Sequence, residues 1–220
     1  MKTACIYHSI DLDGWMSAAI VKHWFETIDK EQEKQTGQSQ RQYHQRDFIG
    51  YNYGQPIPDL SDYDKVIMCD ISFPKEEMEK IAKSGIGISN FIWIDHHISA
   101  IKDVSETHFA KTTNGIRDTK FAACELTWKY FFPNNPMPEI VRLLGRYDCF
   151  GHKGTDEETK VLEFQYGARQ CISNYEEAYS ELTKTDSDTI GELTNLEKIH
   201  RQGKAIYQYL CAEAKQTYKS

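Results

Sequence analysis

The chain has 220 residues, the size of one large domain or of one domain with a modest appendage, since domains typically span roughly 100–200 residues. Its hydrophobic content of 40% and mean hydropathy of −0.64 are those of an ordinary globular protein. No apolar run approaches the ~18 residues of a membrane helix, and Asp11 and Asp13 interrupt the N-terminus before a signal-like stretch can form. These features exclude collagen-like and fully disordered chains and predict a cytoplasmic protein without a membrane partner.

The net charge and the spacing of the cysteines exclude two further classes of protein. The formal net charge is −7 and the sequence pI about 5.6, whereas proteins that follow a nucleic-acid backbone neutralise many phosphates with Lys and Arg. We therefore expect no duplex nucleic acid as a partner. The six cysteines contain no CxxC pair, so they are expected to be core thiols rather than zinc ligands or disulfides.

Short apolar runs alternate with helical patterns over the first hundred residues. The pattern predicts a strand at 4–8, a helix that includes Met16 to Trp24, a polar frayed end and loop at 29–46, and strands at 48–51, 66–69 and 91–94, with a helix from Phe73-Pro74 to about Lys83. The strands are continuously apolar rather than alternating, which is typical of parallel strands covered on both faces. Asn114-Gly115 is expected to form a turn.

Helical patterns dominate from Arg117 onward, at 121–132, 138–147, 157–166, 175–182 and 190–218. The predicted fold class is α/β, with a Rossmann-like, mainly parallel sheet of about five strands and flanking helices, followed by a helical extension. The α/β domain is expected over 1–150 and the helical extension or linker over 151–220. The apolar stripe of the last helix predicts a packing role.

Acidic and histidine side chains follow three of the predicted strands. The segments are HSIDLDG, with His8, Asp11 and Asp13; MCDIS, with Asp70; and WIDHH, with Asp95, His96 and His97. Because ligands bind at the carboxyl edge of an open parallel sheet, these side chains are expected to meet there. A single such Asp could simply cap the following helix, but three strand ends together indicate a site.

A cluster of carboxylates needs cations, since like charges held close together raise each other's pKa unless a metal neutralises them. Asp and His without a thiolate suit Mn²⁺, with Mg²⁺, Co²⁺ or Zn²⁺ as alternatives. The sequence therefore predicts a divalent-metal site at the edge of the sheet.

In order and spacing, HSIDLDG, MCD, IDHH and the later GRYD at Asp148 resemble the four motifs of the DHH phosphoesterase superfamily, over about residues 3–150. That superfamily includes single-strand exonucleases, oligoribonuclease and phosphoadenosine-phosphate phosphatases, cyclic-dinucleotide phosphodiesterases and manganese pyrophosphatases. The chain departs from it in two ways. Its first motif has one more residue between the His and the first Asp than the family pattern HxDxDG. In addition, no glycine-rich, histidine-containing motif of a C-terminal substrate domain follows Asp148. Gly151-His152-Lys153-Gly154 is only superficially similar to that motif.

The resemblance implies a two-metal centre. Asp70 would bridge the two ions, Asp95 would orient His96, and His97 would face the substrate phosphate, so that Asp70, Asp95 and His97 are the expected catalytic residues. Only the resemblance to the family indicates which of the two adjacent histidines is a metal ligand. The implied metal ligands are His8, Asp11, Asp13, Asp70, His96 and Asp148.

The expected reaction is hydrolysis of phosphate esters of short oligonucleotides or small nucleotides, by a hydroxide held between the two ions. Four carboxylates would balance the charge of two divalent ions. Arg117, Lys120 and Arg146 are candidates for contacts to substrate phosphate, although solvated surface cations are the common alternative. The expected partner is a small phosphorylated substrate or a short single-stranded oligonucleotide. The alternatives are a pyrophosphatase-type phosphoanhydride hydrolase and a non-catalytic nucleotide-binding regulatory module.

Overall fold

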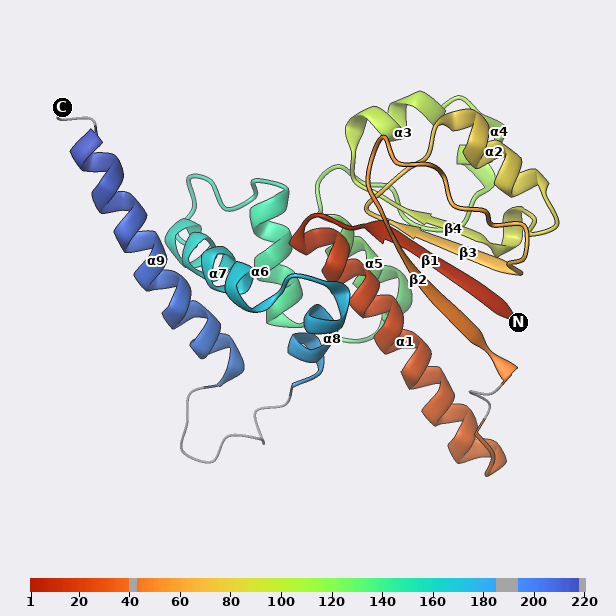
Figure 1. Ribbon diagram of the computed structural model, residues 1–220, viewed down its shortest axis with the longest axis horizontal. Coiled ribbons are helices and arrows are strands. Elements are labelled where there is room, and N and C mark those ends of the chain that lie inside the picture. The colour runs from red at the N-terminus through yellow and green to blue at the C-terminus, as the bar shows by residue number, and fades with distance from the viewer. Residues whose placement is uncertain (40–42, 185–193, 218–220) are drawn as a thin grey trace.

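The computed structural model describes residues 1–39, 43–184 and 194–217 (Figure 1). Its centre is a parallel four-stranded sheet in the order β2-β1-β3-β4, formed by β1 (Lys2–His8), β2 (Gln45–Tyr51), β3 (Lys65–Cys69) and β4 (Phe91–Ile94). In the shared register, Ile6 pairs with Ile49 on one side and with Met68 on the other. All four strands therefore end at the same edge, which confirms the predicted α/β fold with a parallel sheet.

The sheet has one strand fewer than the predicted five within the part of the chain that the structure describes. Asn114 and Arg117 form isolated parallel bridges to Ile92 and Asp95, next to β4, where a fifth strand would lie. Between them Gly115 has φ +115°, and a Cβ there would lie 2.0 Å from the Trp93 carbonyl oxygen. This close approach interrupts a regular ladder, so the fifth position is filled by backbone without a continuous strand.

Helices cover both faces of the sheet, as continuous apolar strands require. One face packs against α1 (Leu12–Thr36) and α5 (Ala123–Phe131), through side chains such as Cys5, Ile67 and Ile94. The other face uses Ala4, Ile6, Met68 and Trp93, and is covered by α2 (Lys75–Lys83), α3 (Ile98–Val104) and α4 (His108–Thr112). A short 3-10 turn, η2, spans Ile88–Asn90. The sequence pattern gave no sign of α3 and α4.

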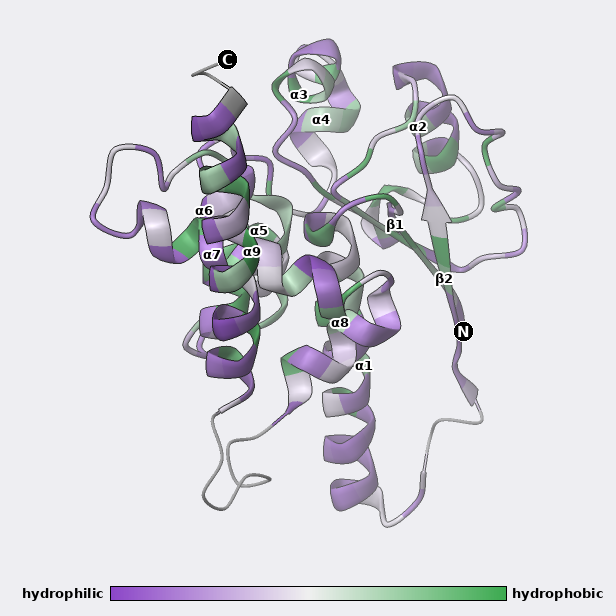
Figure 2. Cartoon of the chain, turned by 60° about the vertical axis from the view of Figure 1, so that its left-hand side comes forward, coloured by the Kyte–Doolittle hydropathy of each residue, from purple (hydrophilic) through white to green (hydrophobic). Residues whose placement is uncertain are grey.

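Helix α1 is longer than the predicted pattern. It continues to Thr36 and ends at Gly37, whose φ of +69° is the left-handed conformation that glycine favours at a helix end. The final turns are exposed and polar (Figure 2), so apolar periodicity does not reveal them. Arg46 on β2 forms a bidentate contact with Asp29, at 2.6 and 2.7 Å, which ties this part of α1 to the sheet.

The described part of the second half is helical, as predicted, with α6 (Glu139–Asp148), α7 (Glu158–Cys171), α8 (Tyr175–Thr183) and α9 (Asn195–Thr217), while 190–193 and 218 of the predicted last helix lie outside the described residues. Val161 and Ala168 of α7 and Ala178 of α8 lie in the same apolar core as α1 and α5. The part after residue 150 therefore packs directly beside the sheet-covering helices, and α7 lies next to α6. The predicted boundary at 150 stays a prediction.

Helix α9 packs across α7, at the end of the molecule farthest from the sheet (Figure 1). The two helices cross at glycines, because a Cβ on Gly203 would lie 1.7 Å from the Glu163 carbonyl oxygen and one on Gly167 would lie 1.9 Å from that of Ile199. The last helix therefore has the packing role that its stripe predicts. Within the described ranges, no helix is both long and apolar enough to cross a bilayer.

Candidate metal centre

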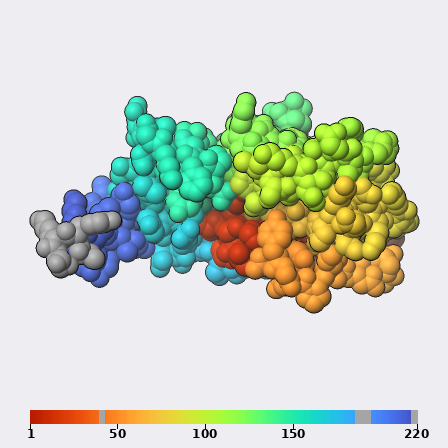
Figure 3. Space-filling model, turned by 90° about the horizontal axis from the view of Figure 1, so that it is seen from above, coloured from red at the N-terminus to blue at the C-terminus, as the bar shows by residue number. Residues whose placement is uncertain are grey.

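The turn between β1 and α1 brings three predicted ligands to the edge of the sheet. His8 ends β1, and Asp11 caps α1 by accepting a hydrogen bond from the Gly14 N–H at 2.9 Å. A Cβ on Gly14 would lie 2.0 Å from the His8 carbonyl oxygen, so only glycine allows the helix to begin this close to the strand. Asp13 lies in the first turn. Seen from above, this N-terminal segment lies between the two halves of the molecule (Figure 3).

Asp13 is fixed by the start of α5. Its two carboxylate oxygens accept hydrogen bonds from the backbone N–H groups of Cys124, at 2.8 Å, and Ala123, at 2.9 Å. Burial and the neighbouring Asp70 carboxylate nevertheless raise the pKa of Asp13 to about 7. The carboxylate is thus held in place while its charge remains poorly compensated.

Asp70 lies at the centre of the cluster. It follows β3 with φ 61°, a left-handed conformation that aims its side chain along the edge of the sheet, and its N–H donates to the Ile94 carbonyl at 3.0 Å. The side chain is 1% exposed, with Oδ2 3.5 Å from His8 Nδ1 and Oδ1 3.3 Å from His96 Nε2. The two oxygens of one carboxylate therefore face two different histidines.

Asp148, the last residue of α6, completes the cluster from the helical side. Its Oδ2 lies 3.3 Å from His96 Nε2, which is also 3.6 Å from Asp13 Oδ2. The possible ligand atoms form three groups, each with all atoms within 4.8 Å of one another: His8 with Asp11 and Asp70, Asp13 with His96 and Asp148, and Asp70 with His96 and His97. The structure thus brings together all six residues that the resemblance implies as ligands, with Asp70 shared between groups.

The residues present fit divalent cations. Both ring nitrogens of His8 and both oxygens of Asp70 are buried, yet none makes a hydrogen bond of ordinary geometry to a residue that the structure describes. Burial and the charge of Asp13 raise the pKa of Asp148 to about 7, against the opposing effect of His96, as expected where carboxylates crowd together. Oxygen and imidazole donors without a thiolate suit Mn²⁺ or Mg²⁺. His8 Nδ1 also lies 2.7 Å from Asp11 Oδ2, so these buried donors converge on one small volume, as the ligands of a shared cation do.

Asp95 orients His97, which corrects the expectation that it orients His96. Its Oδ1 lies 2.8 Å from His97 Nδ1 and accepts backbone N–H groups from His96, at 2.8 Å, and His97, at 3.1 Å. The turn after β4 directs the His96 ring toward the carboxylates and folds the His97 ring back over Asp95. The Asp95 hydrogen bond outweighs burial and raises the pKa of His97.

Arg117 is a structural residue, which corrects its predicted contact with substrate phosphate. Its guanidinium donates to the backbone carbonyls of Trp93, at 3.0 Å, and of Thr113 and Asn114, both at 3.1 Å. These bonds hold the segment beside β4 in place. The other two predicted cations stay predictions: the Lys120 residue is exposed and Arg146 is half-buried on α6.

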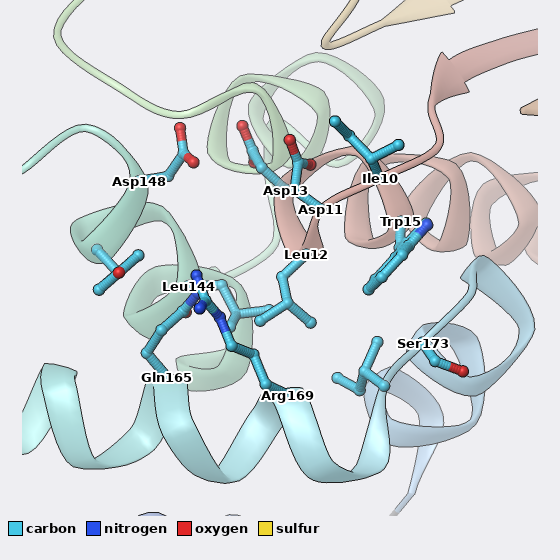
Figure 4. A pocket seen from close by; sticks show the side chains of 12 residues that line it. Ile10, Asp11, Leu12, Asp13, Trp15, Leu144, Asp148, Gln165, Arg169 and Ser173 are labelled. Carbon is cyan, nitrogen blue, oxygen red and sulfur yellow. The ribbon is translucent and has the colours of Figure 1, made fainter. Parts of the chain in front are cut away.

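A cavity of about 400 Å³ opens beside the carboxylates, between the start of α1, α6 and α7 (Figure 4). The carboxylates of Asp11, Asp13 and Asp148 lie on one side of it, and Gln165 and Arg169 of α7 on the other. Neither of these two α7 residues is among the site residues predicted from the sequence. Their spacing of four on a helix is the available signal, but the predicted helix ended at Tyr166, whereas α7 continues to Cys171.

The comparison with protein families finds a match over most of the chain. The model of the DHH family, N-terminal domain, matches residues 3–144, the region that supplies the sheet and the ligands of the β1, β3 and β4 ends. The chain belongs to the DHH family. This DHH protein is thus a member of the DHH phosphoesterase superfamily, and the resemblance is confirmed over the first three motifs, since the match ends just before GRYD at Asp148.

Two longer proteins are similar to this DHH protein. Uncharacterized protein R106 of Acanthamoeba polyphaga mimivirus is 30% identical over 154 residues, which are 67% of this chain and 33% of the relative. The crystal structure of an uncharacterized protein from Helicobacter pylori G27 superimposes with a TM-score of 0.55 at 14% identity, covering 92% of this chain and 61% of the other. The second likeness supports the fold alone. The chain spans about a third of the length of the mimivirus protein and about three fifths of the length of the Helicobacter pylori protein.

Proposed function

We propose that this DHH protein is a two-metal phosphoesterase that hydrolyses phosphate esters of short oligonucleotides or small nucleotides. The observation that carries the proposal is the placement of Asp70, whose buried oxygens face His8 on one side and His96 on the other. A carboxylate shared in this way allows two cations to share a ligand and a substrate phosphate.

Each side of Asp70 offers a complete set of donors. His8 and Asp11 would hold one ion with it, and Asp13, His96 and Asp148 the other. Two bound divalent ions, with Mn²⁺ preferred by these donors, supply Lewis acidity and make a water acidic enough to ionise near neutral pH. The backbone N–H groups of Cys124 and Ala123 keep the Asp13 carboxylate in position, so that the ligands need little rearrangement.

His97 is the group placed to handle a proton. Asp95 Oδ1 lies 2.8 Å from its Nδ1, and this hydrogen bond raises the pKa of His97, which shifts the ring toward its protonated form. The side chain is 33% exposed, so the ring remains accessible from the site. In this proposal His97 binds the substrate phosphate and donates a proton to the leaving oxygen, while Asp95 keeps the ring oriented.

The substrate is proposed to be small. The adjacent cavity of about 400 Å³ is of the size usual for small-molecule sites, and the net charge of −7 disfavours a long polyanion. A pyrophosphatase would need several cations to hold two phosphates, whereas Arg169 is the one cationic side chain among the described residues that line this cavity. The presence of every implied ligand disfavours a purely regulatory module.

The test is a hydrolysis assay of the purified chain with Mn²⁺ on three substrates: bis(p-nitrophenyl) phosphate, a dinucleotide and pyrophosphate. We expect the chain to hydrolyse the dinucleotide, and we expect a chelator to abolish this activity and added Mn²⁺ to restore it. Hydrolysis of pyrophosphate alone would favour the phosphoanhydride alternative. Metal and nucleotide binding without turnover of any substrate would favour the regulatory one.

A further inference from the structure

Helix α7 presents two polar side chains to the cavity that also contains the carboxylates of the candidate centre. Gln165 and Arg169 are four residues apart, so they lie on the same face of the helix, one turn from each other. Figure 4 shows both rising from α7 on the side of the cavity opposite Asp11, Asp13 and Asp148. A ligand held by the carboxylate side would therefore face α7.

Gln165 is buried, with 5% of its surface exposed, and its Oε1 makes no hydrogen bond to any residue in the described ranges. Leaving a buried amide oxygen unpaired costs about 1–3 kcal/mol, and most such groups in proteins have a partner. An apolar residue would fill the same space without that cost. The unpaired amide at the cavity wall therefore points to a ligand that supplies the missing hydrogen bond.

Arg169 brings a positive charge to the same wall. Its guanidinium lies 5.6 Å from the centre of the Tyr147 ring, and that ring stacks on His152 at 5.4 Å with an interplanar angle of 6°. His152 is itself 2% exposed and contacts the Arg146 carbonyl oxygen through Nδ1 at 2.9 Å, so the stack has a rigid base. No ion pair of Arg169 with another described residue is found. Arg169 is exposed where it lines the cavity and contacts the Tyr147 ring on one side, so its N–H donors are open to an anion.

We propose that Gln165 and Arg169 form the phosphate-binding wall of the active site, opposite the metal ligands. Arginine donors match phosphate oxygens in a bidentate manner, and the neighbouring amide can bond the same group or the ester oxygen attached to it. This inference rests on the proposed phosphoesterase function and adds to it a second set of substrate contacts, from the helical part of the chain. The phosphate that Arg169 binds is either the one held by the metals or a second one nearby.

Isothermal titration of the Mg²⁺-loaded protein with two probes tests Arg169. The probes are inorganic phosphate and methylenediphosphonate, which carries two phosphonate groups and is not hydrolysed. Arg169→Ala is expected to weaken binding at least about tenfold, because it removes a charge-assisted contact. If both probes bind more weakly to this variant, Arg169 contacts the metal-bound phosphate. If only methylenediphosphonate binds more weakly, Arg169 contacts a second phosphate. Unchanged binding of both overturns the proposal.

Arg201→Ala is the matched control, because it removes the same charge from an exposed position on α9. It is expected to bind both probes as the unaltered chain does. Arg169→Lys keeps the charge but loses the bidentate geometry, so it should recover only part of the affinity. If Arg201→Ala weakens binding as much as Arg169→Ala, the effect is one of net charge and the proposal fails.

Gln165→Met tests the amide separately. If the unpaired oxygen serves only a ligand, its replacement by an apolar side chain of similar size should leave the melting temperature unchanged or higher. KM for the hydrolysed substrate should rise about three- to tenfold with little change in kcat, and the affinity for inorganic phosphate should fall. A lower melting temperature with unchanged KM and phosphate affinity would show a structural role and contradict the proposal.

The two proposals fail in different ways. Probe binding that depends on Arg169, in a chain that hydrolyses no phosphate ester, would contradict the proposed function and leave the phosphate-binding wall standing. Hydrolysis whose KM is the same for the unaltered chain, Arg169→Ala and Gln165→Met would contradict the phosphate-binding wall alone.

Discussion

Asp70 is the residue on which the candidate centre depends, because each of its oxygens faces a different group of ligands. Asp70→Asn removes the charge that both cations would share. We expect it to abolish hydrolysis and to weaken binding of both ions, by at least about tenfold in calorimetric titration with Mn²⁺.

The variant should still fold, because removing a buried carboxylate relieves repulsion from Asp11 and Asp13. Asp62→Asn changes the same charge at an exposed position before β3 and serves as the control. Stoichiometry and affinity equal to those of the unaltered chain would contradict the bridging role of Asp70.

Single residues show both the success and the limit of sequence reasoning. Five of the six implied ligands lie at or after strand ends that meet at one edge, which the sequence pattern can reveal, whereas Asp148 ends α6 and was implied by the family resemblance alone. The direction of a side chain after a strand depends on the turn, so the pairing of Asp95 with His97 rather than His96 needed coordinates. Likewise, the sequence predicts only that Arg117 is a polar residue in a loop. The structure shows that its guanidinium donates its hydrogen bonds to backbone carbonyl groups.

At the scale of elements, an ion-pair network joins the start of α6 to the start of α7. Arg142 donates to Glu139 and to Glu157, at 2.7 to 2.9 Å, and Lys160 contacts Glu139 at 2.8 Å. The hydrogen bond from Arg142 lowers the pKa of Glu139 to about 2. Since the pKa is depressed on folding, the stabilisation is present above the unfolded value near 4.5 and is lost as the pH falls toward 2.

Glu139→Gln should therefore lower the free energy of unfolding by about 1 kcal/mol at pH 6, because solvent screens a pair whose Glu139 side chain is 36% exposed. At pH 3 this loss of unfolding free energy should be less than half of its value at pH 6. Urea unfolding at the two pH values measures it, with Glu76→Gln on α2 as the exposed control. A deficit that does not change with pH would show that the charge of Glu139 is not its source.

The elements that the sequence predicted share a physical feature, which is burial of an apolar face. The strands are apolar because helices cover both sides, and the helices from α5 to α9 each bury a stripe. The end of α1, the helices α3 and α4, and the fifth strand lack that signal. The end of α1 is polar and exposed, α3 and α4 are only 7 and 5 residues long, and Gly115 interrupts what would be a fifth strand.

For the whole molecule, charge and cavity size predict a preference for short substrates. A protein that holds a long single strand needs a cationic groove with stacking residues, and its binding falls steeply with salt. This chain has a net charge of −7 and a cavity of about 400 Å³ beside the ligands. We expect catalytic efficiency to decline from a dinucleotide to about a 20-mer at moderate ionic strength, with weak salt dependence. A rate that rises with length would instead indicate an exonuclease with a nucleic-acid channel.

The central claim is that the edge of the sheet binds divalent metal, and thermal unfolding with and without Mn²⁺ tests it most directly. A ligand that binds only the folded state at a hundred times its Kd stabilises by about 2.7 kcal/mol. For a chain of this length we expect the melting temperature of the metal-free protein to rise by at least about 5 °C, and a chelator to reverse the rise. A melting temperature indifferent to Mn²⁺, Mg²⁺, Co²⁺ and Zn²⁺ alike would contradict the metal centre.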